Sequence, residues 1–407
     1  MQKIHCKIRM SIFLHLSRKK IKHWHASILL GALVVFISVF GFVRSQDNLS
    51  YDSTASNEIK KKVNDEVKNK VEIVAVKKPP EHIKTPTAVR AAYMTSWVAG
   101  TQSIREKLIA FMEGSELNSV VVDIKDYTGR VAFETDNEVV RTMGSSEKRI
   151  ADVSGLIEEL HSKKIYVIGR IAVFQDPFAT KKKPEWAVAA RSGGIWHDRK
   201  GLAFIDPGAE GYWNYIVQIA KASEEVGFDE INFDYIRYPS DGVLSNALFP
   251  YAKGREKQIV LEDFFKYLHE QLKDTKIPIS ADLFGLATWA EDDLGIGQVL
   301  ERAAPYFDFI APMVYPSHYA SGFGGYKNPA EHPYEIIKIS MDHGIERMKK
   351  INQDPNKLRP WIQDFDLGAD YGMKEIQAQK KAIYDAGLTS WMSWDPKNQY
   401  TQGAYQK

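Results

Sequence analysis

Short apolar segments and amphipathic helical segments alternate from residue 88 to the end of the chain, and this alternation constrains the fold more than any other feature. Short apolar strands separated by helices are typical of a parallel sheet that is covered by helices. We expect strands at 90–97, 118–126, 165–174, 229–239, 277–285, 307–316, 358–365 and 389–396. We expect helices near 104–112, 152–163, 211–226, 258–272, 296–303, 333–350 and 374–386.

The number of strand–helix units predicts the architecture. Eight units in one domain indicate an α/β fold of the closed (β/α)8, or TIM, barrel type, which needs roughly 250 residues. The segment 88–407 is long enough for it. The alternative is an open doubly wound sheet, which usually carries a glycine-rich phosphate-binding turn after its first strand, and no such turn follows 90–97. The barrel is therefore the predicted fold.

The N-terminal region predicts a membrane anchor. Residues 24–43 carry no formal charge, and a helix of about 20 apolar residues spans a bilayer. The segment 1–23 is rich in lysine and arginine, so the positive-inside rule keeps it in the cytoplasm and places the rest of the chain outside. A cleaved signal peptide is the alternative. It fits less well because "RSQDNLS", which follows, lacks a small-x-small cleavage pattern. We therefore expect a single-pass protein of the cell membrane with an extracytoplasmic domain.

The segment 44–87 predicts a flexible stalk. Lysine, glutamate and asparagine dominate it, and Pro79, Pro80 and Pro86 close it. Such a composition cannot bury a core, and it is typical of linkers. The folded domain is accordingly expected at 88–407.

Composition argues against several classes of partner. The net charge is +2 and no basic tract follows the N-terminal region, so nucleic acid is not expected as a partner. One cysteine excludes an intrachain disulfide and a cysteine-based metal site. Neither a paired-histidine helix nor a calcium loop is present in the sequence, so we expect no metal and no cofactor.

Polar residues gather where the predicted strands end. Functional groups of a (β/α)8 barrel lie at the C-terminal ends of its strands. An acidic pocket braced by arginines is therefore predicted there, with carbohydrate as its ligand. The residues expected to form it, beginning with the second strand, are Asp123, Arg170, Asp234, Tyr235, Arg237, Asp282, Tyr315, His318, Gln363, Asp364, Trp394 and Asp395.

Two of these acids are the candidates for catalysis. Hydrolysis of a glycosidic bond needs one carboxyl group that protonates the leaving oxygen and a second that attacks the anomeric carbon or activates water. Asp234 and Asp282 belong to adjacent predicted strands, which lie about 4.8 Å apart. Arg170 or Arg237 would keep one acid ionised, and a less charged setting would keep the other protonated.

Each of these assignments has a purely structural alternative. Asp234 would pair with Arg237 at the strand end, or Asp282 would cap the following turn. Asp123 is expected to support the site or a loop rather than to react. Asp364 and Asp395 are equally compatible with a contact to the ligand and with turn capping. His318 is interpreted as a surface or substrate contact, because it has no second histidine at metal-ligand spacing.

The motifs "FDYIRYPSDG", "ADLFG", "APMVYPSHY" and "WIQDF", in this order, resemble a bacterial family of predicted glycoside hydrolase domains. These are TIM barrels, distantly similar to the α-amylase-like retaining glycosidases, and the resemblance covers the chain from about residue 88 onward. By position it implies Asp234 as the nucleophile and Asp282 as the acid/base. The amylase-like acid/base is usually a glutamate, so the aspartate at 282 is a departure from that pattern.

Two hypotheses about function follow. The first is a membrane-anchored, extracytoplasmic glycoside hydrolase that cleaves a glycosidic bond in a cell-surface or exported polysaccharide. The second is a barrel at the cell surface that binds glycans without cleaving them, and the departure at 282 keeps it open. Turnover of a bound glycan separates the two.

Overall fold

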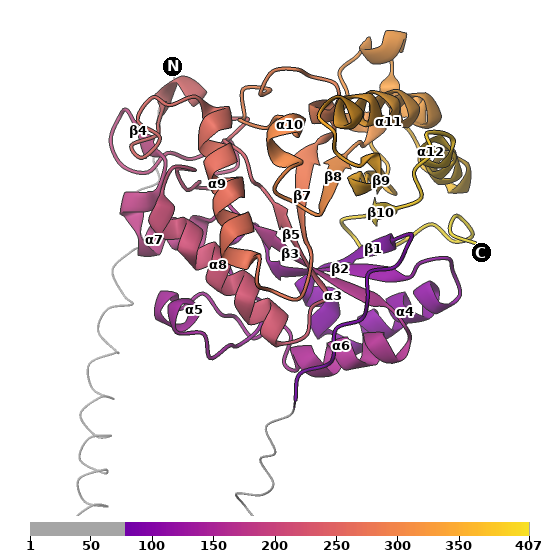
Figure 1. Ribbon diagram of the computed structural model, residues 1–407, viewed down its shortest axis with the longest axis horizontal. Helices are drawn as coiled ribbons and strands as arrows, with labels where there is room; N and C mark the ends of the chain where they lie inside the picture. The colour runs from indigo at the N-terminus through magenta and orange to yellow at the C-terminus, as the bar shows by residue number, and fades with distance from the viewer. Residues whose placement is uncertain (1–77, 407) are drawn as a thin grey trace, which may run out of the picture. The chain divides into compact units, whose positions relative to one another are not determined.

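The computed structural model describes residues 78–406, in which eight parallel strands close into a barrel (Figure 1). The strands are β1 Arg90–Met94, β2 Ser119–Lys125, β3 Tyr166–Ala172, β5 Glu230–Asp234, β7 Ile279–Phe284, β8 Phe309–Met313, β9 Trp361–Gln363 and β10 Trp391–Trp394. β1 pairs in parallel with β2 on one side and with β10, the last strand, on the other. Each observed strand lies within one of the predicted segments, so the (β/α)8 prediction is confirmed.

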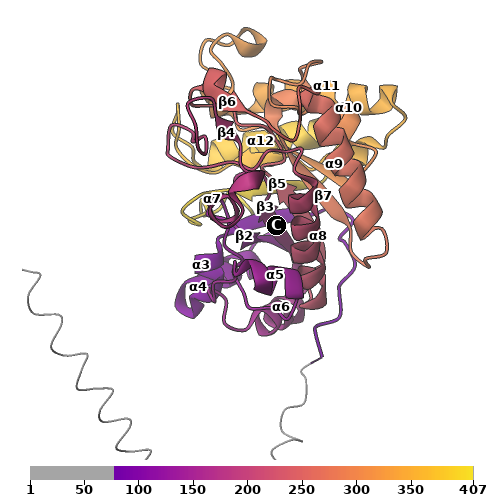
Figure 2. The ribbon, with the colours of Figure 1, turned by 90° about the vertical axis from the view of Figure 1, so that its left-hand side faces the viewer.

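Helices surround the strands (Figures 1 and 2). They are α3 Ser96–Gly100, α4 Gln102–Glu113, α5 Glu138–Met143, α6 Val153–Ser162, α7 Pro177–Lys182, α8 Glu210–Glu225, α9 Lys257–Leu272, α10 Leu300–Ala303, α11 Pro333–Lys350 and α12 Met373–Asp385. One prediction was too long: the helix expected at 296–303 is reduced to α10. Gly295 and Gly297 have φ angles of 67° and 86°, a left-handed backbone that cannot belong to a right-handed helix.

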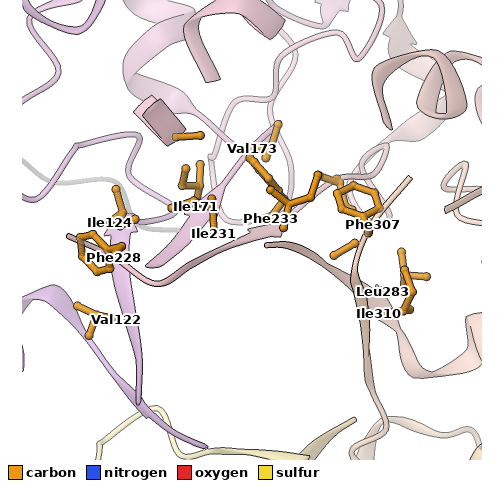
Figure 3. Close-up of a cluster of buried hydrophobic side chains, with 14 of the residues drawn as sticks. Val122, Ile124, Ile171, Val173, Phe228, Ile231, Phe233, Leu283, Phe307 and Ile310 are labelled. Carbon is orange, nitrogen blue, oxygen red and sulfur yellow. The ribbon is translucent and has the colours of Figure 1, made fainter. Parts of the chain in front are cut away.

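The strands are buried on both faces, and their side chains alternate between the two. On β5, Ile231 and Phe233 point outward into the apolar layer between strands and helices (Figure 3). The intervening Glu230, Asn232 and Asp234 point into the barrel, where all three are buried. Because successive strand residues face opposite sides, the sequence "EINFD" delivers polar groups only to the interior. Asp234 is the last of these three polar residues and lies at the C-terminal end of the strand.

A buried ion pair lies inside the barrel at the N-terminal ends of the strands, which form its floor. The Nη1 atom of Arg359 lies 2.9 Å and 3.0 Å from the two carboxylate oxygens of Glu230. Ser280 Oγ and Tyr166 Oη donate to the same carboxylate at 2.7 Å and 3.1 Å. The guanidinium also lies 3.8 Å from the ring centroid of Phe309. Both carboxylate oxygens of Glu230 are therefore hydrogen-bonded.

Two insertions in the loops after β3 and β5 meet beside the barrel. They form a two-stranded antiparallel sheet of β4 Ala189–Ala190 and β6 Ala247–Leu248. Trp196 and Phe204 are buried in a small apolar cluster under this sheet. Trp196 Nε1 donates to the carbonyl oxygen of Val243, at 3.0 Å, and so ties the first insertion to the second.

The predicted tail 1–23, the membrane segment 24–43 and most of the stalk 44–87 lie outside the described residues. The end of the predicted stalk is hydrogen-bonded to the barrel: Ile83 N donates to Asp229 Oδ1 at 2.8 Å, and Thr85 Oγ1 lies 3.0 Å from Tyr166 Oη. Within residues 78–406, the helices are all too short or too polar to cross a membrane.

Substitution of Glu230 by glutamine is expected to destabilise the protein by about 3–5 kcal/mol, because it leaves the buried charge of Arg359 without a partner. Urea denaturation followed by circular dichroism measures this change. The double variant E230Q/R359M should recover part of the loss, and E134Q at an exposed glutamate should change the free energy of unfolding little. An E230Q variant as stable as the unsubstituted protein would show that the pair does not hold the floor of the barrel.

Candidate active site

A cavity of about 420 Å³ opens at the C-terminal ends of the strands. It is lined by Arg170, Asp234, Tyr235, Arg237, Asp282, Phe284, Gly285, Leu286, Met313, Tyr315, His318, Tyr319, Trp361 and Trp394. Both candidate catalytic acids are among these residues, as are most of the predicted substrate contacts. The volume is in the range of ordinary small-molecule sites.

Arg170 on β3 connects the acids of the cavity. Its Nη2 pairs with Asp234 Oδ2, its Nη1 donates to Asp123 Oδ1 at 2.7 Å, and its Nε lies 3.7 Å from Asp282 Oδ2. Burial would lower the pKa of Arg170, but the carboxylates of Asp234 and Asp123 outweigh that effect and hold the pKa well above its usual value. One guanidinium therefore faces carboxyl groups from three strands.

Aromatic rings fix the plane of the Arg170 guanidinium. Its central carbon lies 5.1 Å from the ring centroid of Trp394 and 5.7 Å from that of Tyr93. Those two rings are stacked with centroids 3.9 Å apart. Tyr93 Oη donates to Asp123 Oδ2 at 2.5 Å, which holds this carboxylate against the arginine. Burial raises the pKa of Asp123, and the Arg170 guanidinium opposes this shift.

Asp234 is oriented by a strained turn. Tyr235, which follows it, has a φ angle of 52°, which costs about 1 kcal/mol or more for a residue with a side chain. This conformation directs the Tyr235 backbone N–H to Asp234 Oδ1, at 2.5 Å. Both carboxylate oxygens are thus held, one by the backbone and one by Arg170. Among the described residues Asp234 forms no ion pair with Arg237, so the structural bridge considered from the sequence is not made.

Asp282 has a different environment. Its Oδ1 accepts hydrogen bonds from Asn232 Nδ2 at 2.9 Å and from Trp361 Nε1 at 2.8 Å, and its carboxyl group does not cap the following turn. Burial, and then the negative charge of Asp234, raise the pKa of Asp282 to about 8. The group is therefore protonated at neutral pH. Since Oδ1 accepts two hydrogen bonds, the proton belongs on Oδ2, the oxygen that faces Arg170.

The strand register explains why these two acids meet. β5 and β7 are adjacent and parallel, and Phe233 pairs with Ala281. Asp234 and Asp282 each follow that pair by one residue, so they stand at the same level of the barrel. Both are on the inward face, because Phe233 and Ala281 belong to the outer apolar layer. The prediction that the two aspartates share one side of a closed barrel follows from this register.

Four predicted contacts lie outside the residues that line the cavity: Asp123, Gln363, Asp364 and Asp395. Asp123 reaches the site only through Arg170. Gln363 accepts from Ser317 Oγ at 2.9 Å and donates to the carbonyl oxygen of Phe365 at 2.8 Å, so it joins the loops after β8 and β9.

Asp364 and Asp395 bind the C-terminal segment. Asp364 accepts from Thr401 Oγ1 at 2.6 Å and from Tyr405 Oη at 2.8 Å. Asp395 accepts from the backbone N–H groups of Gln399 and Lys397, at 2.5 Å and 3.2 Å. These are the capping roles that were the alternative to ligand contact.

Several functional positions were not predicted from the sequence. Asn232 and Tyr93 hold the two acids Asp282 and Asp123. Asn232 shares the inward face of β5 with the polar residues Glu230 and Asp234, and this alternation was its signal in the sequence. Gly285 lines the cavity, and a larger residue would not fit there, because its Cβ atom would lie 2.5 Å from the carbonyl oxygen of Met313. Glycine lets this wall of the cavity approach the strand closely. Phe284, Leu286 and Tyr319 gave no pattern in the sequence.

Within residues 78–406, no group of three or more histidine, cysteine, aspartate or glutamate side chains is arranged to hold a metal ion. The chemistry available from the described side chains is proton transfer and nucleophilic attack by carboxyl groups, assisted by Arg170.

The described residues form a (β/α)8 barrel with two neighbouring carboxyl groups in a cavity at the C-terminal ends of its strands. Residues 91–400 match the family model DUF4015, described as "Putative glycosyl hydrolase domain". The match spans most of the chain, and the protein belongs to this family.

Two solved structures are similar to the chain. A hypothetical protein from Ruminiclostridium thermocellum is 35% identical, with a TM-score of 0.44, and the match covers 50% of this chain and 98% of that one. The glycoside hydrolase domain of PgaB from Bordetella bronchiseptica is 13% identical, with a TM-score of 0.52, over 77% of this chain and 95% of that one. At that identity the likeness shows the fold alone. No curated protein matches the sequence.

The raised pKa of Asp282 predicts a pH dependence of stability. The pKa is about 8 in the folded protein and about 4 in an unfolded chain, so the folded state binds one more proton between these values. The free energy of unfolding should therefore fall as the pH rises from 4 to 8. The variant D282N should show a smaller fall between pH 5 and pH 8.5 in urea denaturation, whereas D136N at an exposed aspartate should keep the full fall. Equal slopes for D282N and the unsubstituted protein would contradict the assignment.

Proposed function

We propose that the protein is a glycoside hydrolase that cleaves a glycosidic bond in a cell-surface or exported polysaccharide. The observation that carries this proposal is the pair Asp234 and Asp282, which stand at the same level on adjacent strands but in opposite electrostatic settings. Asp234 lies at ion-pair distance from the guanidinium of Arg170. Asp282 is buried and keeps its proton. This division of roles is the one that glycosidic cleavage needs.

In the proposed mechanism, Asp282 donates the proton on Oδ2 to the glycosidic oxygen while Asp234 attacks the anomeric carbon. The bond to the leaving sugar breaks, and a glycosyl ester forms on Asp234. Asp282, now a carboxylate, then takes a proton from water, which attacks the ester and releases the sugar. Atoms and charges balance over the two steps, and both carboxyl groups return to their starting states.

Arg170 is arranged to assist the proton transfer. Its Nε is buried and has no hydrogen-bond partner, and it lies 3.7 Å from Asp282 Oδ2. Once Asp282 has given up its proton, Oδ2 carries charge and can accept a hydrogen bond from this N–H. A donor that is used only after proton transfer stabilises the later state more than the earlier one, which is how an enzyme lowers a barrier.

Replacing either acid should abolish turnover without loss of the fold. On a panel of polysaccharides, the unsubstituted protein should release reducing sugar. D282N should lose about 10²–10⁴-fold in kcat on the polysaccharides, because the leaving oxygen is no longer protonated. Given a glycosyl fluoride, whose leaving group needs no proton, D282N should accumulate the glycosyl ester on Asp234, seen as added mass on the intact protein. D234N should lose at least as much and form no ester, and D136N should keep full activity.

Binding of a glycan by the unsubstituted protein without product release would favour the non-catalytic glycan-binding barrel instead. Full activity of D234N on a cleaved substrate would remove Asp234 from the mechanism. Titration calorimetry on the same glycans separates these outcomes.

We further propose that the domain acts outside the cell, held by a membrane anchor at 24–43. The support is the uncharged length of that segment and the basic residues that precede it. In bacterial spheroplasts that produce the full-length protein, added protease should remove a C-terminal epitope while a cytoplasmic marker protein stays intact. Protection of the epitope in intact spheroplasts would place the barrel in the cytoplasm.

A further inference from the structure

A second cavity of about 420 Å³ adjoins the candidate active site. It shares Tyr235 and Arg237 with the first cavity, so a ligand chain that fills the first continues directly into the second. Its other walls come from the loop after β2, the insertion after β3 and the turn after β5. These residues are Tyr127, Gln175, Asp198, Lys200, Leu202, Phe204, Ser240 and Asp241. Tyr127 is 52% exposed and offers a ring face at the rim, on which a sugar can stack.

Arg237 stands between the two cavities without a carboxylate partner. Among residues 78–406, all acidic oxygens lie beyond 4 Å from its nitrogen atoms, whereas Arg170 has three acids around it. Its Nη1 donates to the carbonyl oxygen of Tyr238 at 3.0 Å and to Ser240 Oγ at 3.2 Å. One edge of the guanidinium is thereby fixed by the chain, and the other is left for a ligand.

The surroundings of Arg237 are aromatic. The ring centroids of Phe284, Tyr235 and Phe204 lie 4.9 Å, 5.4 Å and 5.9 Å from its central carbon. Burial lowers the pKa of Arg237, although an arginine in a protein stays protonated. A positive charge that is partly desolvated and lacks a counter-ion favours an incoming anion more than an exposed one does.

Among the described residues, the other charged groups of the second cavity leave Arg237 free to pair with an anion of the ligand. Asp198 Oδ1 accepts from the backbone N–H groups of Lys200 and Leu202, both at 2.8 Å, so this acid is used in holding its own loop. The Lys200 side chain is exposed and adds a second positive charge. Asp234, Asp241 and Asp198 act on Arg237 only from beyond ion-pair distance. Of the two that line the second cavity, Asp198 is engaged by its own loop, so Asp241 is the acid with which a bound anion would compete.

We propose that the second cavity binds an anionic sugar unit of the polysaccharide, adjacent to the bond that is cleaved, and that Arg237 pairs with its negative group. The inference deepens the proposed hydrolase and rests on it. The group is a carboxylate, as in a uronic acid, or a phosphate on the sugar. Both fit the planar donor edge of arginine, which binds such anions through two parallel hydrogen bonds.

The test uses substrates that differ only in charge. Polyuronates such as alginate and polygalacturonate are compared with the same polymers after chemical reduction of the carboxylate to the alcohol, and phosphorylated glycans are compared with their dephosphorylated forms. For the full-length protein, kcat/KM on one charged polymer should exceed that on its neutral partner by about 10- to 100-fold, the effect of a charge-assisted pair. The pair of polymers that shows the difference identifies the anion.

Substitutions assign the preference to Arg237. R237Q should bring the charged-to-neutral ratio to about one, and R237K should restore part of it. R141Q, which removes a charge from the exposed surface of α5, should leave the ratio at its original value. D241N should raise the ratio, because it removes the competing acid. A ratio near one for the unsubstituted protein, an unchanged ratio for R237Q, or a fall in the ratio for D241N would each overturn the inference.

Failure of the hydrolase proposal gives a different result. If no polymer is cleaved, titration calorimetry on the same pairs still measures whether binding depends on the anion and on Arg237. If the protein binds a charged polymer and R237Q does not, the proposed anion site is supported and the hydrolase proposal is rejected. Equal affinity for the charged and the neutral member of every pair would contradict the anion site, just as equal turnover of the two members would.

Discussion

The contact of one guanidinium with carboxyl groups from three strands is the interaction on which the site depends. Arg170 pairs with Asp234 and Asp123 and lies close to Asp282, and all four residues are buried. Without its charge, three acids would stand together in a buried space, and repulsion would force them to take up protons. With it, Asp234 and Asp123 lie at ion-pair distance from a positive charge, while burial raises the pKa of Asp282. The acid–base asymmetry of the site therefore derives from the arginine as much as from the acids.

A polar barrel interior is stable only if its groups satisfy one another. The strands build this interior in layers, with Glu230, Asn232 and Asp234 rising along β5. The lowest layer is neutralised by Arg359, and Asn232 donates to Asp282 in the layer above. Since a buried unpaired polar group costs about 1–3 kcal/mol, the layers depend on one another. The rigidity of the site follows from this interdependence, because few side chains can move without leaving a partner unpaired.

The sequence predicted the strands well because their signals are local. Each strand is a short apolar run, and the helices between them are amphipathic. α10 was predicted too long because the predicted helix began at 296 and included Gly297, whose left-handed backbone interrupts a helix. Asp234 and Asp282 were identified because polar residues inside an apolar strand are conspicuous. Gln363, Asp364 and Asp395 have the same signal but bind the loops and the C-terminal segment, and their partners lie in other loops of the chain.

The order of strands and helices, the closed barrel and the residues at the strand ends were determined by the sequence itself, because periodicity and strand parity act between neighbours in the chain. Which acid keeps its proton, which arginine is paired and which remains open to a ligand were decided only by the tertiary structure. Arg170 and Arg237 are similar in the sequence, because each lies within a predicted strand. Both arginines have aromatic neighbours, but folding brings three carboxyl groups within ion-pair distance of Arg170 and, among the described residues, none within that distance of Arg237. Electrostatic interactions depend on distance and burial rather than on position in the chain.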